Sequence, residues 1–316
     1  MKKIPLLVIA GPTGVGKTEC AIRLAKMLNG EIISADSMQV YKYMDIGTAK
    51  PDDEEQQEAK HHLIDIVEPD QDFTVSDYKN LFDMTVPLVV AAGKLPMVVG
   101  GTGLYIRVCL QSYLTGNPAG ADWELRKRLN EQADEKGLSY LFEELKRVDL
   151  IAAGRIHPND KRRIIRALEV YENTGKPISE LHANQVNDSI YTPVYLFLDR
   201  ERSELYRRIE ERVDRMFEKG FLQEVRSLLE RGYSPGLKPM QGLGYHQINE
   251  YFQNKFSLEQ AIAQVKQQTR NYAKRQLTWF RKEPVDLSVD MTGNNREFFG
   301  EILVYLEGRL SGMSNN

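Results

Sequence analysis

Gly11-Pro12-Thr13-Gly14-Val15-Gly16-Lys17-Thr18 fills the pattern G-x-x-x-x-G-K-[ST] of a phosphate-binding loop. The apolar run from Leu6 to Ala10 predicts a buried strand before it, and the apolar spacing from Thr18 to Leu28 predicts a helix after it. Glycines let a backbone wrap closely round phosphate oxygens, and a helix N-terminus directs its N–H groups at them. We therefore expect these eight residues to bind a phosphate chain, with the Lys17 charge beside it and the Thr18 hydroxyl as a ligand of Mg²⁺.

The composition is that of a soluble globular protein. The chain has 316 residues, 28% of them charged and 41% hydrophobic, and its formal net charge of −3 means that any contact with nucleic acid needs local basic clusters. The two cysteines, Cys20 and Cys109, lack metal-ligand spacing and are expected to be reduced thiols. No run of eighteen apolar residues occurs, and Met1-Lys-Lys leads directly into the first strand. We expect no membrane span, no signal peptide and a cytoplasmic location.

The alternation of strands and helices predicts an α/β fold with a parallel sheet. Further strands are expected at Glu31–Ser34, Leu95–Val99 and Tyr195–Leu198, whereas nearly everything from Asp122 to Leu181 has helical spacing. We predict a phosphate-loop core of the nucleotide-kinase type, a parallel sheet flanked by helices, interrupted by an all-helical insertion domain. The expected limits are 1–116 for the first part of the core, 117–189 for the insertion and 190–316 for the second part of the core, with its basic C-terminal helices.

Asp36 follows the second expected strand, at the edge where parallel sheets carry their chemistry. If that strand neighbours the first, the carboxylate lies beside the phosphate loop, where it can act as a metal ligand or a general base. A capping aspartate in a turn is the competing interpretation, and Asp36 by itself does not decide between them.

The residues around Asp36 resemble the signature of the tRNA dimethylallyltransferases, also called tRNA isopentenyltransferases, of the bacterial type. The likeness begins in Asp36-Ser-Met-Gln-Val-Tyr-Lys-Tyr-Met-Asp-Ile-Gly-Thr-Ala-Lys-Pro51. Further segments that carry it are His61–Ile66, Gly100–Tyr105, His157–Glu169, Thr174–Pro177, Gly244-Tyr245 and Ala273–Arg281. These motifs occur in order and cover most of residues 4–283.

The resemblance implies a reaction that composition and spacing alone do not reveal. That family transfers the dimethylallyl group of dimethylallyl pyrophosphate to N6 of the adenine just 3′ of the tRNA anticodon. The phosphate loop would hold the pyrophosphate leaving group, and Lys17 and Mg²⁺ at Thr18 would stabilise its growing charge. Asp36 would take the proton from the amine, and the Thr102 hydroxyl would bond to a donor oxygen near the breaking bond. For Thr102, capping of a glycine-rich turn is the alternative.

Arg208 and Arg212 resemble family arginines that approach the donor phosphates. They are four residues apart and therefore share one helix face, the arrangement that a phosphate clamp requires. A surface helix with ion pairs to Glu204, Glu211 and Glu218 explains the pattern nearly as well.

Two basic segments give independent support for RNA binding. Lys266–Lys282 carries six basic and no acidic residues among three aromatic ones, and Arg155–Arg166 carries five basic residues and one acidic residue. Both suit contacts with a phosphate backbone, although a basic helix face often meets only water. The target adenine must also leave its stack to react. Together with the resemblance, this gives the expected tRNA contacts: Asp36, Ser37, Met38, Gln39, Thr102, Asp160, Lys161, Arg162, Arg163, Ile164, Arg166, Lys274, Arg275, Trp279 and Arg281.

Other functions compete with tRNA prenylation. An adenylate isopentenyltransferase acting on free AMP, ADP or ATP would need neither the basic C-terminal helix nor the insertion. A small-molecule kinase fits the phosphate loop but not the Asp36 signature, and the same signature argues against a non-enzymatic ATP-dependent RNA-binding module. His61 and His62 would point to opposite sides of an extended segment, which argues against a shared zinc site. We expect a monomer whose partners are tRNA and dimethylallyl pyrophosphate, with no membrane.

Overall fold

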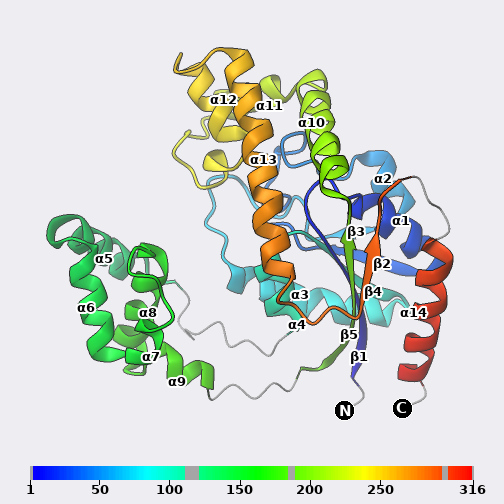
Figure 1. Ribbon diagram of the computed structural model, residues 1–316, viewed down its shortest axis with the longest axis horizontal. Coiled ribbons are helices and arrows are strands. Elements are labelled where there is room, and N and C mark those ends of the chain that lie inside the picture. Colours follow the sequence, from blue (N-terminus) through cyan, green and yellow to red (C-terminus); the bar gives the residue numbers. More distant parts are fainter. Residues whose placement is uncertain (1–2, 111–120, 184–188, 294–297, 315–316) are drawn as a thin grey trace. The chain divides into compact units, whose positions relative to one another are not determined.

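A computed structural model describes residues 3–110, 121–183, 189–293 and 298–314, and the chain divides into two compact units (Figure 1). One unit comprises Met1–Leu110 and Ile190–Asn316 and contains the sheet, and the other comprises Gln111–Ser189. The expected boundary between residues 116 and 117 lies outside the described residues. None of the described helices is long and apolar enough to cross a membrane.

Six parallel strands form the sheet in the order β3-β2-β4-β1-β5-β6. They are β1 Ile4–Ala10, β2 Gly30–Ser34, β3 His61–His62, β4 Leu95–Gly100, β5 Tyr191–Asp199 and β6 Leu287–Asp290. This parallel sheet flanked by helices is the fold class that the sequence predicts. The strand before the phosphate loop and the strand before Asp36 are not neighbours, because β4 lies between β1 and β2.

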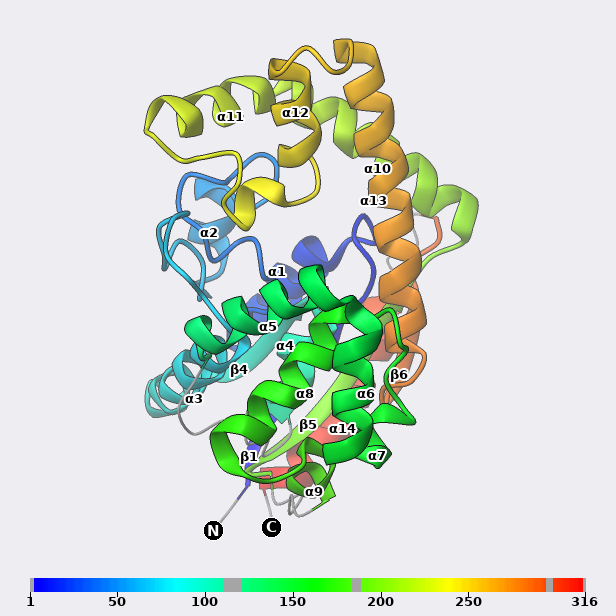
Figure 2. The same cartoon turned by 90° about the vertical axis from the view of Figure 1, so that its left-hand side faces the viewer.

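Helices cover both faces of the sheet. Those of this unit are α1 Lys17–Leu28, α2 Asp53–Glu58, α3 Val75–Ala91, α4 Gly103–Leu110, α10 Arg202–Glu218, α11 Phe221–Glu230, α12 Tyr245–Phe252, α13 Leu258–Phe280 and α14 Phe298–Ser314, with a short 3₁₀ helix at Pro239–Gln241. Figures 1 and 2 both show α13 running beside α10, with α12 next to its N-terminal half, and α11 packs against α12.

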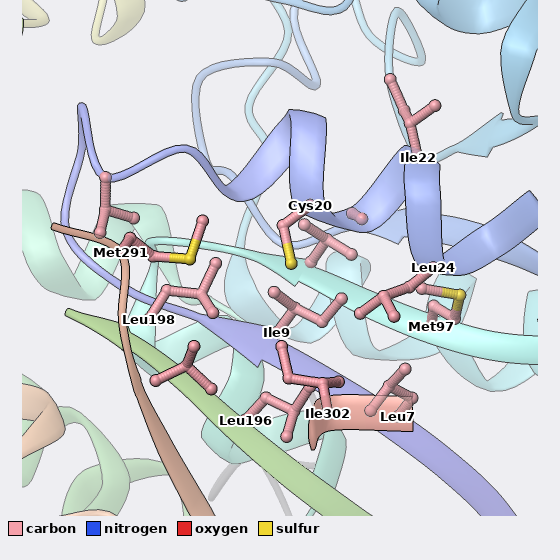
Figure 3. Packing of buried hydrophobic residues seen from close by; sticks show 14 of the residues in the cluster. Leu7, Ile9, Cys20, Ile22, Leu24, Met97, Leu196, Leu198, Met291 and Ile302 are labelled. Carbon is pink, nitrogen blue, oxygen red and sulfur yellow. The ribbon is translucent and has the colours of Figure 1, made fainter. Parts of the chain in front are cut away.

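Two hydrophobic clusters cover the sheet, one on each face, and a third joins residues 40–44 to α11 and α12. Leu7 and Ile9 of β1 pack with α1 and α14, as Figure 3 shows from close by. Leu6 and Val8 of the same strand pack with α3 and α4 on the opposite face. Since both faces are buried, the central strands read as continuous apolar runs rather than as alternating ones. Cys20 lies in the first cluster and Cys109 in the second, and both thiols are free.

Strands β5 and β6 differ from the sequence prediction, and the two-residue strand β3 was not predicted either. β5 begins at Tyr191 rather than Tyr195 and runs through Pro193. Proline lacks an N–H group, but β6 pairs with β5 only from Leu196 onward, so Pro193 has β1 on one side and no ladder to complete on the other. The four-residue strand β6 was not predicted, because so short a segment has too little periodicity to be recognised.

The second unit is helical from residue 123 to residue 183, apart from short connections, as expected. Its helices are α5 Trp123–Lys136, α6 Leu138–Val148, α7 Leu150–Ala153, α8 Lys161–Thr174 and α9 Ile178–Ala183. Glu169 of α8 is fully buried in it and accepts hydrogen bonds from Arg126, Arg166 and the backbone N–H of Asp122 at 2.6–3.0 Å. This carboxylate joins α8 to the start of α5.

Candidate active site

The phosphate loop, residues 11–16, connects β1 to α1 in a shape that needs glycine. Gly16 has φ 109°, a left-handed conformation that residues with side chains rarely adopt. A Cβ atom on Gly11 would lie 2.6 Å from the carbonyl oxygen of Leu198 in β5. Val15 is fully buried in the core. Gly11 therefore lets the loop pack closely against β5, and Val15 anchors the loop in the hydrophobic core.

The carbonyl oxygens of the loop are held by three cations, Lys17, Arg200 and Arg208. The acceptors are the oxygens of Gly11 and Pro12 for Lys17 (3.0 and 2.9 Å), of Val15 for Arg200 (3.3 Å) and of Gly14 for Arg208 (3.1 Å). In addition, the first N–H groups of α1 have no partner within the helix. A loop whose carbonyl groups are engaged in this way can present its N–H groups to an anion.

The cations around the loop crowd one another. Burial and, to a smaller extent, the Arg212 charge lower the pKa of Lys17 to about 8, and the Asp36 charge opposes both effects. Burial also lowers the pKa of Arg208 and that of Arg212; neighbouring arginines add to both shifts, and the Asp36 charge opposes the shift at Arg212. A bound anion would relieve this desolvation and repulsion, as expected of a phosphate site.

The alternative interpretation of α10 as a surface helix with ion pairs does not hold for the two arginines in question. Within the described residues, neither Arg208 nor Arg212 is paired with a carboxylate, whereas Glu211 pairs with Arg207 at 2.7 Å and Glu204 pairs with Arg200. The face of α10 that carries Arg208 and Arg212 is directed at the phosphate loop instead.

One cavity of about 540 Å³ brings the phosphate loop and Asp36 together. Although β4 separates their strands, the carboxyl ends of all parallel strands meet at one edge of the sheet. The lining includes, of the residues expected from the sequence, Thr13, Gly14, Gly16, Lys17, Thr18, Asp36, Ser37, Met38, Gln39, Arg208, Arg212 and Arg275. Gly11, Pro12, Val15, Thr102, Lys274, Trp279 and Arg281 are not part of it.

Asp36 begins a turn directly after β2 and uses one carboxylate oxygen to hold it. Oδ1 accepts the backbone N–H of Met38 at 2.9 Å, and Oδ2 has no hydrogen-bond partner among the described residues. The amide of Gln39, in the same cavity, is fixed by Ser34 Oγ (2.9 Å) and by the carbonyl oxygen of Ala49 (3.1 Å). The capping interpretation thus accounts for one oxygen of Asp36 and leaves the other for chemistry.

Thr102 contacts the cavity through a neighbour. Its backbone N–H donates to the Ala35 carbonyl oxygen at 3.1 Å, which ties the turn after β4 to the end of β2. Its hydroxyl oxygen accepts the backbone N–H of Ser37 at 3.1 Å, and the hydroxyl donates to Ser37 Oγ at 3.3 Å. Thr102 is therefore hydrogen-bonded to Ser37, the residue that follows Asp36 in the sequence.

The basic segment at α13 is smaller than the sequence suggests. Lys266 pairs with Asp214 at 2.6 Å and Arg270 pairs with Glu210 at 2.5 Å, so α10 neutralises two of the six cations. The others, which form no ion pair with any described residue, are Lys274, Arg275, Arg281 and Lys282, and all four are exposed.

The aromatic residues near the end of α13 contribute mainly to the core. Phe280 is only 2% exposed, which excludes it from stacking on a base. The Trp279 ring lies 4.3 Å from the Arg107 guanidinium, and a Cβ atom on Gly103 would lie 2.2 Å from its Nε1. Trp279 is thus packed against α4. Its expected contact with RNA stays a prediction, and only the exposed part of the half-buried ring could make it.

In the insertion, several of the expected RNA-binding residues have structural partners. The Asp160 side chain caps α8 by accepting the backbone N–H of Arg163 at 3.1 Å, and Lys161 pairs with Asp134 at 2.7 Å. Ile164 is fully buried in the core of the insertion, so its side chain cannot contact RNA as expected. Arg162 and Arg163 are exposed.

Sequence reasoning missed the inner face of α13. Thr269, Tyr272 and Gln276 line the cavity, and Thr269 and Gln276 are 8% and 6% exposed. Their spacing of three and four residues places them on one helix face. The sequence did contain a signal for this face: polar residues occupy positions where the helical periodicity requires apolar ones. Phe221 and Tyr245, from α11 and α12, also border this cavity, but these residues are 1% and 0% exposed and therefore support its wall without offering surface to a ligand.

His61 and His62 do not share a ligand. His62 Nε2 lies 2.6 Å from a Glu31 carboxylate oxygen, and His61 Nδ1 lies 2.7 Å from the Ala59 carbonyl oxygen. In the described part of the chain, no group of three or more His, Cys, Asp or Glu residues could hold a metal ion.

A phosphate loop, a cluster of cations and a half-free carboxylate in one cavity define a phosphate-loop α/β protein with an anion site next to a possible base. The model of the IPP transferase family matches residues 39–283. The chain is 49% identical to the tRNA dimethylallyltransferase of Syntrophobacter fumaroxidans over 282 residues, 89% of this chain and 82% of that protein. It is 48% identical to the tRNA dimethylallyltransferase of Geobacillus thermodenitrificans over 310 residues, 96% and 97% of the two chains.

Two solved structures are similar over nearly all of the chain. The full-length tRNA isopentenylpyrophosphate transferase from Bacillus halodurans has a TM-score of 0.74 and 40% identity, covering 100% of this chain and 99% of that one. A eukaryotic dimethylallyltransferase acting on tRNA has a TM-score of 0.85 and 29% identity, covering 99% and 80%. The chain belongs to the IPP transferase family.

Proposed function

We propose that this protein transfers the dimethylallyl group of dimethylallyl pyrophosphate to N6 of the adenine 3′ of the anticodon in tRNA and releases pyrophosphate. The observation that carries the proposal is the single cavity that Asp36 shares with the phosphate loop. Its relatives, named for dimethylallyl transfer to tRNA, favour this function over a kinase or an adenylate isopentenyltransferase.

The phosphate loop and its cations bind the pyrophosphate of the donor. As the allylic C–O bond breaks, negative charge grows on the pyrophosphate, and the loop N–H groups, Lys17, Arg208 and Arg212 stabilise it.

Asp36 acts as the general base. The lone pair of adenine N6 is delocalised into the ring, which makes the amine a poor nucleophile. As N6 forms its bond to the allylic carbon, the unpaired Oδ2 of Asp36 accepts a proton from N6. The turn held by Met38 keeps the carboxylate in place while Oδ2 does this.

Mg²⁺ fits this site. The Thr18 hydroxyl lines the cavity at the start of α1. Mg²⁺ keeps several waters and commonly binds one or two protein oxygens together with substrate phosphates, so one hydroxyl suffices on the protein side. When bound, the ion would neutralise charge on the leaving pyrophosphate.

The tRNA anticodon stem-loop binds the exposed cations of α13 and of the insertion. Lys274 and Arg275 lie on α13, Arg281 follows its last residue, and Arg162 and Arg163 lie on α8. Cations of this kind contact the phosphate backbone and position the RNA without reading its sequence. A cytoplasmic, monomeric enzyme remains our prediction.

Radiolabelled dimethylallyl pyrophosphate tests the proposal when it is supplied with unmodified tRNA, AMP or ATP in separate reactions. We expect label in tRNA alone, with no ATP consumed, and slower labelling with Lys17→Ala as the matched control. Label in AMP or ATP would identify an adenylate isopentenyltransferase. Label in no acceptor would refute prenyl transfer.

A further inference from the structure

Gln276 of α13 joins the two loops that carry the chemistry. Its Oε1 accepts the backbone N–H of Thr13 at 2.8 Å, and its Nε2 donates to the carbonyl oxygen of Gly101 at 2.9 Å. Thr13 belongs to the phosphate loop after β1, and Gly101 belongs to the turn after β4 that contains Thr102. The fit is close, since a Cβ atom on Gly101 would lie 2.3 Å from Nε2. One buried amide thus sets the distance between these loops.

Tyr272, one turn earlier on the same face of α13, continues the connection. Its hydroxyl lies close enough to Gln276 and to Thr102 to interact electrostatically with both side chains. Because Oε1 of Gln276 already accepts from Thr13, the second N–H of the amide is the group that can donate to the Tyr272 oxygen, and Tyr272 can donate its proton to Thr102 Oγ1. Burial and the nearby Asp36 charge raise the pKa of Tyr272 to about 12, so the phenol keeps that proton at neutral pH.

The chain of hydrogen bonds ends in the reaction centre. Thr102 donates to Ser37 Oγ at 3.3 Å and accepts the Ser37 N–H at 3.1 Å, and Ser37 follows Asp36 directly. The hydrogen bonds therefore connect the phosphate loop through Gln276 to the turn of Gly101 and Thr102, and through Thr102 to the segment that carries Asp36. Both Tyr272 and Gln276 also line the cavity itself.

We propose that Tyr272 and Gln276 are positioning residues for prenyl transfer: Gln276 fixes the phosphate loop, and Tyr272 fixes the Thr102 hydroxyl. The donor pyrophosphate and Thr102 then keep one relative position while the allylic bond breaks. This inference rests on the proposed function, because it explains how Thr102 is held for its role at the donor oxygen.

A double-mutant cycle tests the role of Tyr272. Tyr272→Phe removes only the hydroxyl, and we expect kcat to fall about tenfold while KM for the donor stays within about twofold. In a Thr102→Ala background the same replacement should change kcat less than about twofold, because no hydroxyl remains to be oriented. An equal tenfold loss in both backgrounds would mean that Tyr272 does not act through Thr102, and it would overturn this part of the proposal.

Binding of inorganic pyrophosphate, measured by calorimetry, tests Gln276 without any transfer reaction. Gln276→Met, which is similar in length and preserves packing, should weaken binding about tenfold, since the Thr13 N–H loses its acceptor. Tyr272→Phe should change affinity less than about twofold, and Gln267→Met, the same replacement at an exposed position of the same helix, should leave it unchanged. Thermal unfolding of each variant shows that the fold is kept.

The two experiments separate this inference from the proposed function. Unchanged pyrophosphate affinity in Gln276→Met overturns the inference, whether or not the wild-type protein transfers a prenyl group. If Gln276→Met binds pyrophosphate more weakly, Gln276 is upheld as the residue that anchors the phosphate loop. If, in addition, the wild-type protein transfers no prenyl group to any acceptor, the proposed function is refuted and the inference stands.

Discussion

Replacing Asp36 with Asn removes the proposed base with little disturbance of the fold. Oδ1 of Asp36 accepts the Met38 N–H at 2.9 Å, and the side-chain oxygen of Asn can accept the same hydrogen bond, so the turn after β2 should survive. The replacement removes the carboxylate that takes the N6 proton. General-base catalysis contributes about 10²- to 10⁴-fold, so we expect the single-turnover rate to fall by that factor with near-normal affinity for tRNA.

The same replacement has a second, independent signature in the pH profile. Lys17 binds pyrophosphate in its charged form, which dominates below its pKa of about 8, so kcat/KM for the donor should fall as pH rises through about 8. The Asp36 charge raises this pKa, so in Asp36→Asn the fall should begin at a lower pH. A rate within a few-fold of wild type, together with an unshifted basic limb, would refute the reasoning on both counts.

The remaining predictions concern the donor site, the RNA surface and the insertion. Lys17→Ala should raise KM for the donor and slow transfer, and pyrophosphate should compete with the donor in steady-state assays; a normal KM would place the donor elsewhere. Lys274→Ala with Arg281→Ala should lower tRNA affinity and make the plot of log affinity against log salt shallower by up to about 0.9 per lost contact, whereas Lys266→Ala, whose partner is on α10, should not. An unchanged slope would mean that RNA does not bind this end of α13. Glu169→Leu should destabilise the protein by about 3 kcal/mol in urea unfolding, because it leaves two arginines without their carboxylate; an unchanged midpoint would contradict that.

Local patterns were enough to predict the phosphate loop, the strand and the helix that flank it, and the helical insertion. The glycines at 11, 14 and 16 carry their conformational requirement in the residue type itself, and the apolar runs of β1 and β4 are long enough to recognise. The order of the strands is not a local property. The position of β4 between β1 and β2 depends on which apolar segments pair with one another. No single segment of the sequence encodes that choice.

The candidate site was predictable where one residue type carries the chemistry. Lys17, Asp36, Arg208 and Arg212 were identified, and the structure brings them to one cavity. The sequence could not predict that cations and amides hold the phosphate loop in place, because these side chains and their partners are distant in sequence. Gln276 meets the phosphate loop 263 residues away. In the same way, the ion pairs that occupy Lys266 and Arg270 come from α10 and reduce the basic surface that the sequence suggested.

The nucleoside composition of a treated tRNA tests the central claim most directly. An unmodified tRNA with adenine 3′ of the anticodon is incubated with the protein and dimethylallyl pyrophosphate, digested and analysed by mass spectrometry, beside the same tRNA carrying guanine at that position. We predict that one adenosine gains a dimethylallyl group on N6 in the first tRNA and that the second tRNA stays unmodified. Modification of both tRNAs, or of neither, would contradict the account.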